Sequence, residues 1–472
     1  MTSLSKLFLL TASISALGLA ACQKTDVPKS DAPKTAKAKN VILFIGDGMG
    51  ISTITAARIY DGQTKGMNGE DNKLSFEEFP NLSLVKTYNL DAQVPDSAGT
   101  ASAMNTGMKT EIGKINVQPD GHYAACETGE GVAPTLIADL AERAGMSTGI
   151  VSTARLTHAT PAAVYGHSVS RGWEHDTSMG EKGNEHGCTD LAAQLVNYSA
   201  GDGIDIALGG GRGGFLTVDA GGRRKDGTDL TAAWRAKSDS HLYAGDAKSL
   251  RALNPNDKQN VLGVFNGSHL SYEADRDEAE EPSLTELTEF AIKNLDARDT
   301  GYFLMVESGR IDHAHHGTNA YRALTETQEL ARAVALADKL TNDEDTLLLV
   351  TADHSHVFTI AGYPKIGNPI LGLVHPAGEG SDETSKAGDG LPYTTLGYHN
   401  GQNPRSEIEQ TEEMVQAKDY HQQSAIQRPS ETHGGEDVAL FAKGPGADKV
   451  RGLIDQAEIF GIMTDALGLE ND

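Results

Sequence analysis

Short, continuous apolar runs alternate with helical patterns along this chain, and that alternation constrains its fold more than any other feature. The runs are unbroken, as in strands buried on both faces of a sheet, and they cover residues 41–45, 148–152, 204–208, 302–306, 346–350 and 438–442. Helical patterns cover residues 52–60, 135–144, 283–295 and 319–340. Because strands that alternate with helices build a parallel sheet covered on both faces, the sequence predicts a doubly wound, mostly parallel α/β domain.

This domain is predicted to occupy residues 40–472, with one interruption. Residues 362–432 are rich in Gly, Pro, Asp, Glu and Gln and show little periodicity, so they are expected to form a loop-rich insertion. The formal net charge of -26 repels polyphosphate, which argues against nucleic-acid binding. Any anionic ligand would need a local attraction, from bound cations or an arginine.

The N-terminus has the features of an export signal. The apolar stretch 7–20 is too short for a stable membrane span, and small residues precede Cys22. We therefore expect residues 1–21 to be a signal peptide, and Cys22 to be the lipid acceptor of a bacterial lipoprotein, periplasmic or anchored to the outer membrane. The alternative is an ordinary secretory signal cut near Ala21. Residues 22–39 are expected to be a flexible tether.

Two cysteines remain in the mature chain, Cys126 and Cys188. In an exported protein an even pair suggests a disulfide, which would stabilise the fold by roughly 4 kcal/mol in the chain-entropy model. Two free buried thiols are the alternative. A metal site is not indicated, because the chain has no CxxC spacing.

Asp47 and Ser97 are candidate functional residues because of the local structure that each is expected to have. Asp47 follows the first predicted strand in a glycine-rich turn, where a backbone can approach a ligand closely. It could also simply cap the next helix. Ser97 begins a run of small residues that favours a helix, whose positive N-terminal end would stabilise an alkoxide. A structural N-cap is the alternative role for this serine.

A second group of candidates contains the ligand types that divalent cations prefer. Asp312 and His316 are four residues apart and would share one face of a helix, which suits a zinc site. Glu307 ends a predicted strand and could serve a harder cation. The pair Asp353–His354 ends another strand. His433 would complete a three-ligand set with Asp312 and His316, leaving an open position as in catalytic zinc sites.

Two other features are assigned structural roles. The glycines of 209–214 match GxGxxG after a strand, but no helix pattern follows, so a dinucleotide site is not expected. The acidic stretch 275–281 is expected to be a solvated face, with a calcium site as the alternative.

Taken in order, these segments resemble alkaline phosphatase. The resemblance runs from Asn40 to about Leu467, and it is carried by residues 46–50, 95–97, 157–161, 307–316, 351–358 and 431–445. It implies a phosphomonoesterase, often a homodimer, with two Zn²⁺ and one Mg²⁺ ion per chain. It also implies that residues 362–432 form a crown near the dimer axis, and that Cys126 and Cys188 pair as in vertebrate members.

The resemblance assigns roles residue by residue. It implies a first zinc held by Asp312, His316 and His433, and a second held by Asp47, Asp353, His354 and Ser97. It implies magnesium held by Asp47, Thr160 and Glu307, with His158 nearby. Arg171 would clamp two phosphate oxygens, and His313 would contact phosphate through water. At a calcium site found in vertebrate members, Phe265 and Glu281 match, whereas Asn266 stands where glutamate is usual.

The expected reaction is hydrolysis of small phosphate monoesters to alcohol and inorganic phosphate through a phosphoserine on Ser97. Phosphodiester or sulfate-ester cleavage is a neighbouring alternative, because related two-zinc folds catalyse both. Those enzymes usually carry another nucleophile and lack the Thr160–Glu307 magnesium set. A non-catalytic phosphate or metal scavenger on the cell surface is a second alternative, but it would need neither Ser97 nor an open zinc position.

Overall fold

The computed structural model describes residues 37–122, 126, 133–378, 383–405 and 407–470. The predicted signal peptide, Cys22 and the tether up to residue 36 lie outside the described residues. Ala38 and Lys39 already hydrogen-bond to the domain, at Ala466 and Asp345, so the ordered region starts slightly before the boundary expected at residue 40. Within the described ranges no helix is both long and apolar enough to cross a membrane.

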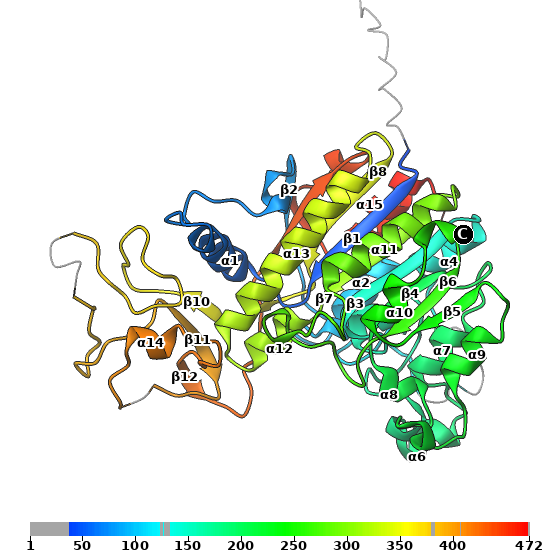
Figure 1. Cartoon of the computed structure of the whole chain (residues 1–472), viewed down its shortest axis with the longest axis horizontal. Helices are drawn as coiled ribbons and strands as arrows, with labels where there is room; N and C mark the ends of the chain where they lie inside the picture. Colours follow the sequence, from blue (N-terminus) through cyan, green and yellow to red (C-terminus); the bar gives the residue numbers. More distant parts are fainter. Residues whose placement is uncertain (1–36, 123–125, 127–132, 379–382, 406, 471–472) are drawn as a thin grey trace, which may run out of the picture. The chain divides into compact units, whose positions relative to one another are not determined.

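A ten-stranded sheet forms the centre of the domain and confirms the predicted fold class (Figure 1). Across the sheet the strands are β15 (Arg451–Asp455), β2 (Asn81–Lys86), β14 (Val438–Lys443), β8 (Thr346–Ala352), β1 (Asn40–Gly46), β7 (Tyr302–Ser308), β3 (Ser147–Arg155), β4 (Ile206–Gly210), β6 (Asn260–Val264) and β5 (His241–Ala244). Strands β1, β7 and β8 are buried along their whole length. This explains why their sequences are continuous apolar runs.

One strand, β14, runs antiparallel to both neighbours, β2 and β8. All other pairs in the sheet are parallel. The beginning of β14 therefore lies at the same edge as the carboxyl ends of β1, β7 and β8. Residues just before β14 can consequently reach a site formed by residues just after the other strands.

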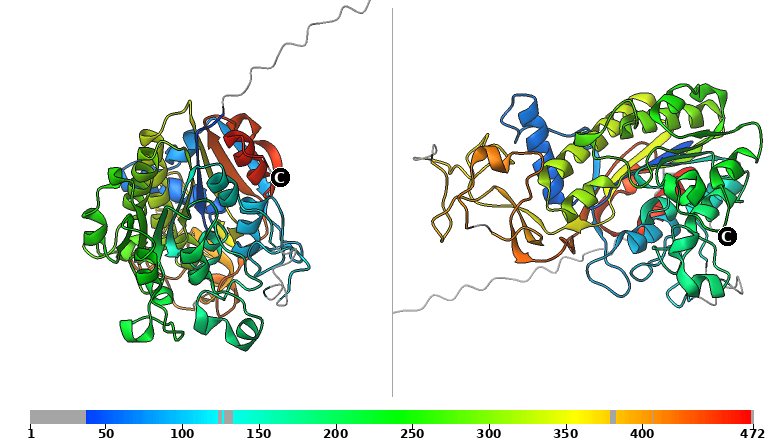
Figure 2. Two further views of the ribbon diagram at one scale, coloured as in Figure 1. Left: turned by 90° about the vertical axis from the view of Figure 1, so that its right-hand side faces the viewer. Right: turned by 60° about the horizontal axis from the view of Figure 1, so that its bottom comes forward.

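Helices cover the sheet in two groups (Figure 2). One group is α1 (Ile51–Thr64), α11 (Leu284–Ala297) and α13 (Ala320–Leu340); the other includes α2 (Ser97–Thr106), α4 (Ile137–Arg143) and α15 (Glu458–Leu467). The first group packs on β1, β3 and β7 through α11 and α13, and the second packs on these strands through α4 and α15. Helix α11 starts with a capping box, since Ser283 and Glu286 hydrogen-bond each other's backbone.

Shorter elements complete the domain. These are α5 (Ala159–Ala162), α6 (Gly180–Glu185), α7 (Leu191–Asn197), α8 (Arg212–Phe215), α9 (Leu230–Arg235), α10 (Ala247–Arg251), α12 (Arg310–His316), β9 (Ser355–His356) and β13 (His433–Gly434). The insertion contains α14 (Glu412–Val415), and its β11 (Leu396–Gly401) and β12 (Ser424–Gln427) pair in one small sheet with β10 (Phe358–Ile360). The rest of the insertion is mostly loop, and it is the orange region of Figure 1.

Four strands of the main sheet were not predicted: β2, β5, β6 and β15. Strands β2 and β15 form one end of the sheet and expose apolar side chains, including Leu84 and Leu453, which face each other across the pair. Strand β5 is short, half-buried and at the opposite end. The continuous-run pattern identifies strands buried on both faces, so it misses the partly exposed strands β2, β5 and β15. Strand β6 is buried along its whole length, but Asn260 and Gly263 interrupt its apolar run. The run at 438–442 is therefore not the last strand.

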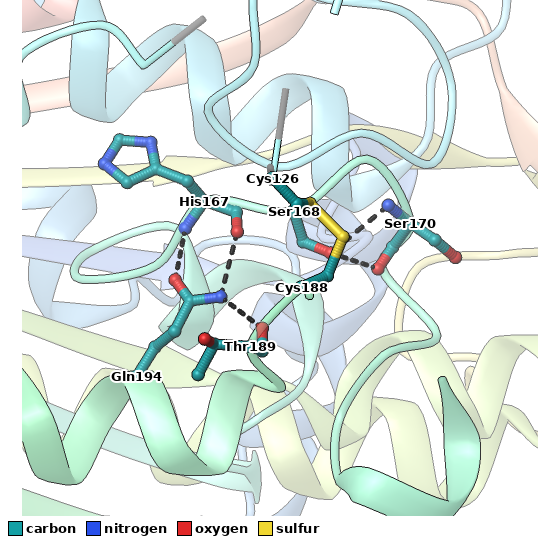
Figure 3. Close-up of a disulfide and its surroundings, with 7 residues drawn as sticks. All are labelled: Cys126, His167, Ser168, Ser170, Cys188, Thr189 and Gln194. Atoms are coloured by element: carbon teal, nitrogen blue, oxygen red, sulfur yellow. Dashed lines mark hydrogen bonds between the residues drawn. A yellow bond between two sulfur atoms is a disulfide. The ribbon is translucent and has the colours of Figure 1, made fainter. Parts of the chain in front are cut away.

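The structure joins Cys126 to Cys188 in a disulfide, which selects pairing over two free thiols (Figure 3). The bond closes a separation of 62 residues. Gln194 on α7 hydrogen-bonds the backbone of His167 and Thr189 beside it. The disulfide thus lies against the segment that carries the site residue Arg171.

Candidate metal and phosphate site

The predicted site residues converge at the carboxyl edge of the sheet, as expected for an open α/β fold. Asp47 follows β1, Glu307 lies near the end of β7, and Asp353 follows β8. His433 reaches the same place because it begins β13, shortly before the antiparallel β14. These side chains come from four distant parts of the sequence, and the topology brings them together.

The first cluster is fully buried and surrounds Ser97. His354 Nε2 lies 3.2 Å from the Ser97 hydroxyl, 3.4 Å from an Asp47 carboxylate oxygen and 3.3 Å from an Asp353 carboxylate oxygen. Asp47, Asp353 and His354 form one of the groups whose ligand atoms could hold a single metal ion. These are the four residues assigned to the second zinc, and the structure brings them together.

The second cluster lies nearer the solvent. His433 Nε2 is 3.2 Å from His316 Nε2 and 3.4 Å from an Asp312 carboxylate oxygen, and His316 Nε2 is 3.3 Å from that same oxygen. Asp312 and His316 share one face of the short helix α12, as their spacing predicted. These are the three residues assigned to the first zinc. Backbone carbonyls orient both rings, because Pro95 accepts from His433 Nδ1 and Glu431 accepts from His316 Nδ1.

A third cluster holds polar atoms that lack partners. Asp47, His158 and Glu307 place ligand atoms close enough to share one ion. One carboxylate oxygen of Asp47, one of Glu307 and the Thr160 hydroxyl are buried, and none of the three has a hydrogen-bond partner among the residues that the structure describes. Buried unpaired oxygens are costly, and a hard divalent cation is the kind of ligand that would satisfy all three. The residues present therefore fit the magnesium site implied by the sequence.

Ser97 is the first residue of α2, as predicted, and it is buried. The N-cap is Asp96, whose carboxylate accepts a hydrogen bond from the Gly99 backbone. Ser97 therefore does not serve as the structural N-cap, and its hydroxyl faces Asp47 and His354. The helix dipole favours negative charge at this position.

Arg171 connects the serine to the third cluster. Its guanidinium donates to Asp96 at 3.0 Å, and its other terminal nitrogen lies 3.2 Å from His158 Nε2. The side chain of Arg171 is about 29% exposed, so it can still meet a ligand. His313 packs beside His158, with ring centroids 5.4 Å apart, and its Nδ1 is buried with no hydrogen-bond partner in the described part of the chain.

The electrostatics of the site reflect crowded, buried carboxylates. Burial, reinforced by Asp353, raises the pKa of Asp47 well above its ordinary value. Burial likewise raises the pKa of Glu307 to about 7. Burial keeps the pKa of His354 well below the usual value, so this imidazole is neutral and able to act as a ligand. Divalent cations would restore the ionised form of these carboxylates.

Two residues of the site were missed by sequence reasoning. His356 Nε2 lies 2.9 Å from an Asp312 carboxylate oxygen, and its Nδ1 lies 2.6 Å from the Glu431 carboxylate. Although burial alone would lower it, Glu431 and Asp312 raise the pKa of His356 to about 10. A charged imidazole thus fixes the orientation of Asp312. The available signal was the Asp-His-x-His spacing, which continues two residues beyond His354.

The two features given structural roles have such roles in the structure. Backbone N–H groups of Gly211 and Arg212 donate to the Asn266 carbonyl, so the glycine-rich turn packs on its own chain. Asp275 forms ion pairs with Arg322 and Lys418. At the position of the vertebrate calcium site, the Glu281 carboxylate accepts hydrogen bonds from Asn266 and Ser271.

Fold and site together define a metal-binding hydrolase with a buried serine among three ligand clusters. A family model described as alkaline phosphatase matches residues 38–469. The tissue-nonspecific alkaline phosphatase of Gallus gallus is 44% identical over 439 residues, which are 89% of this chain and 82% of that protein. The alkaline phosphatase of Gadus morhua is 42% identical over 438 residues, 89% of this chain and 90% of that protein. The chain belongs to the alkaline phosphatase family.

Solved structures agree with the fold. The alkaline phosphatase of Thermus thermophilus superposes with a TM-score of 0.66 at 24% identity, over 94% of this chain and 96% of that one. The alkaline phosphatase of the Antarctic bacterium TAB5 gives a TM-score of 0.62 at 22% identity, over 93% of this chain and 100% of that one. As a member of the alkaline phosphatase family, the chain is an enzyme, a hydrolase of phosphoric monoesters.

Proposed function

We propose that this enzyme hydrolyses phosphate monoesters through a phosphoserine on Ser97, with two Zn²⁺ and one Mg²⁺ bound per chain. The first zinc would be held by Asp312, His316 and His433, and the second by Asp47, Asp353, His354 and Ser97. Magnesium would be held by Asp47, Thr160 and Glu307, with His158 beside it. The observation that carries the proposal is the position of the Ser97 hydroxyl, 3.2 Å from His354 and at the start of a helix.

Each residue has a part in the reaction that follows from its position. Bound cations would supply Lewis-acid stabilisation of the entering and leaving oxygens. Ser97 attacks phosphorus, and its oxygen is stabilised as an alkoxide by the N-terminus of α2. Arg171 holds two phosphate oxygens with its planar guanidinium, and its contacts with Asp96 and His158 fix the orientation of that plane. His313 hydrogen-bonds a water that contacts phosphate.

A phosphate monoester fits this site better than a diester or a sulfate ester. The third cluster shares Asp47 with the first and supplies three buried oxygens that have no partner among the described residues. These oxygens accommodate a third cation, which suits the higher charge of a monoester dianion. One structural neighbour, a variant of TAB5 alkaline phosphatase, is described with magnesium bound. Inorganic phosphate, the product, is expected to bind in the same place.

We further propose that the enzyme is exported and homodimeric. Attachment to a membrane would be through lipid on Cys22. The signal-like sequence of residues 1–21 supports export. Support for dimerisation comes from the crown-like insertion, which exposes Tyr363, Ile366 and Ile426. Apolar side chains of this size on an exposed surface are typical of interfaces between subunits.

The test combines metal analysis with trapping of the intermediate. Purified protein is expected to contain two zinc ions and one magnesium ion per chain and to release p-nitrophenol from p-nitrophenyl phosphate. Labelled substrate should leave phosphate on Ser97, and Ser97→Ala should lose both this label and at least roughly 10³-fold in kcat. Ser102→Ala on the same helix is the control and should keep the label. Undiminished labelling of Ser97→Ala would rule out this nucleophile.

A further inference from the structure

A cleft opens directly beside the second ligand cluster. It encloses about 480 Å³ and is lined by Val94, Pro95, His316, His433 and residues 428–432. His316 and His433 lie between its two walls. One wall is the apolar pair Val94–Pro95, which precedes Ser97, and the other is the segment that follows β12. The cleft therefore connects the proposed reaction centre with solvent.

Exposure shows which side of the reaction centre a leaving group must use. The side chains of Asp47, Asp353 and His354 around Ser97 are fully buried. The side chains of His316 and His433 are 32% and 15% exposed. In an in-line displacement the alcohol departs opposite the attacking serine. Among the residues of the two clusters, His316 and His433 are the ones that line the cleft, so an alcohol on the side away from the buried residues around Ser97 would lie in it.

Arg428 stands at the rim of this cleft with an unpaired charge. Its side chain is exposed and makes no hydrogen bond or ion pair with any residue in the described part of the chain. A free guanidinium binds carboxylate or phosphate groups in a planar, bidentate geometry.

The wall that carries Arg428 is held firmly in place. The Arg428 backbone N–H donates to the Gly401 carbonyl at 2.8 Å. Two residues further on, the Ser430 hydroxyl donates to carbonyl oxygens of His316 and Glu431, and the Glu431 N–H donates to His316 as well. The rim is thus tied to a proposed metal ligand, so Arg428 is anchored near the place where a leaving group would lie.

From these observations we infer that the cleft is a leaving-group subsite, and that Arg428 favours phosphate monoesters whose alcohol carries a second anionic group, either a carboxylate or another phosphate. The inference rests on the proposed function and adds a substrate class to it. Val94 and Pro95 contact the carbon skeleton of the alcohol, and Arg428 pairs with its charge. The contribution is local and offsets the repulsion that the net charge of -26 exerts on such substrates.

The experiment compares phenyl phosphate with 4-carboxyphenyl phosphate, which differ by one charge on the leaving group. Wild type, Arg428→Gln, Arg428→Glu and Arg428→Lys are measured at low ionic strength. We expect the ratio of kcat/KM, carboxylated over neutral ester, to fall about fivefold to tenfold in Arg428→Gln and further in Arg428→Glu. Arg428→Lys should retain part of the preference, and added salt should weaken it.

Arg451→Gln is the matched control, because it removes one exposed positive charge at the amino end of β15, away from the cleft. Its ratio should equal that of wild type. If the kcat/KM ratio does not change in Arg428→Gln, or if kcat/KM falls equally for both esters, the inference about the leaving-group subsite is wrong and the proposed function is unaffected. If wild type hydrolyses neither ester, the proposed function fails and this inference fails with it.

Binding gives a readout that is independent of turnover. Calorimetric titration with benzylphosphonate and 4-carboxybenzylphosphonate should show the same dependence on residue 428, with the carboxylated compound losing about fivefold to tenfold in affinity in Arg428→Gln. Benzylphosphonate itself should bind wild type and variant equally. Equal affinities of the carboxylated compound for wild type and variant would contradict the inference.

Discussion

Arg171 illustrates how much a single residue can depend on its neighbours. An arginine beside a carboxylate usually forms a closed ion pair, yet this one is held by Asp96 at one nitrogen and by His158 at another. Each of the two terminal nitrogens makes one of these contacts, and the side chain remains partly exposed. These contacts orient the guanidinium and leave some of its N–H groups free to bind an anion, which suits a phosphate clamp.

Replacement of Arg171 should therefore act on phosphate affinity. Arg171→Ala is expected to raise the inhibition constant of inorganic phosphate roughly 30-fold to 100-fold, as loss of a bidentate charged contact does. Arg171→Lys should recover little, because an ammonium cannot bind two oxygens in one plane. Inhibition of p-nitrophenyl phosphate hydrolysis by phosphate measures both. An unchanged constant in Arg171→Ala would contradict the clamp.

At the scale of elements, the packing of α4 against β3 contains a buried carboxyl group outside the site. Burial raises the pKa of Glu142 to about 8, although Thr148 donates a hydrogen bond of 2.5 Å to it. This pKa lies above the ordinary value of 4.5, so unfolding releases a proton between these two pH values. The stabilising effect of the protonated form is present below about pH 4.5 and is lost as pH rises toward 8.

Substitution of Glu142 should change the pH dependence of stability with this sign. Glu142→Gln is expected to raise Tm at pH 8 by several degrees and to leave it nearly unchanged near pH 4.5, because the amide keeps the acceptor for Thr148 and carries no charge. Thermal unfolding of metal-loaded protein across this range measures the effect. Glu344→Gln, at an exposed position, is the control. Parallel curves for wild type and Glu142→Gln would refute the prediction.

The disulfide connects two cysteines that are 62 residues apart in the sequence. Loss of the Cys126–Cys188 bond through a double Cys→Ser substitution should lower the free energy of unfolding by roughly 2–4 kcal/mol. Denaturant unfolding measures it, and reduced wild type is the matched comparison, since it lacks the bond but keeps the sulfur atoms. A double variant as stable as oxidised wild type would show that the bond contributes nothing.

At the scale of the whole molecule, the proposed metals connect distant parts of the sheet. Their ligands follow β1 and β8, end β7 and precede β14, and the short helix α12 supplies two more. Ligand binding to the folded state alone stabilises it, by about 2.7 kcal/mol at a ligand concentration of 100 times Kd. Metal ions held by ligands from several strands and from α12 should therefore stabilise the entire domain.

Chelation tests this connection. Treatment with a chelator should abolish turnover of p-nitrophenyl phosphate and lower Tm. Tm should fall because the buried carboxylates of Asp47, Asp353 and Glu307 repel one another once no cation lies between them. Addition of zinc and magnesium should restore both properties together. A chelated protein with unchanged Tm would show that the ligand clusters carry no tightly bound ion.

The sequence by itself determined the fold class, most of the buried strands and most of the ligand residues, because most of these residues lie next to a continuous apolar run or on a short helix with fixed spacing. Asp312 and His316 needed only their separation of four residues. Tertiary structure alone decided that β14 is antiparallel, which brings His433 to the carboxyl edge, and that His356 pairs with Asp312 and Glu431. Strand direction and contacts between residues far apart in the chain depend on packing across the whole sheet, and no local pattern encodes them.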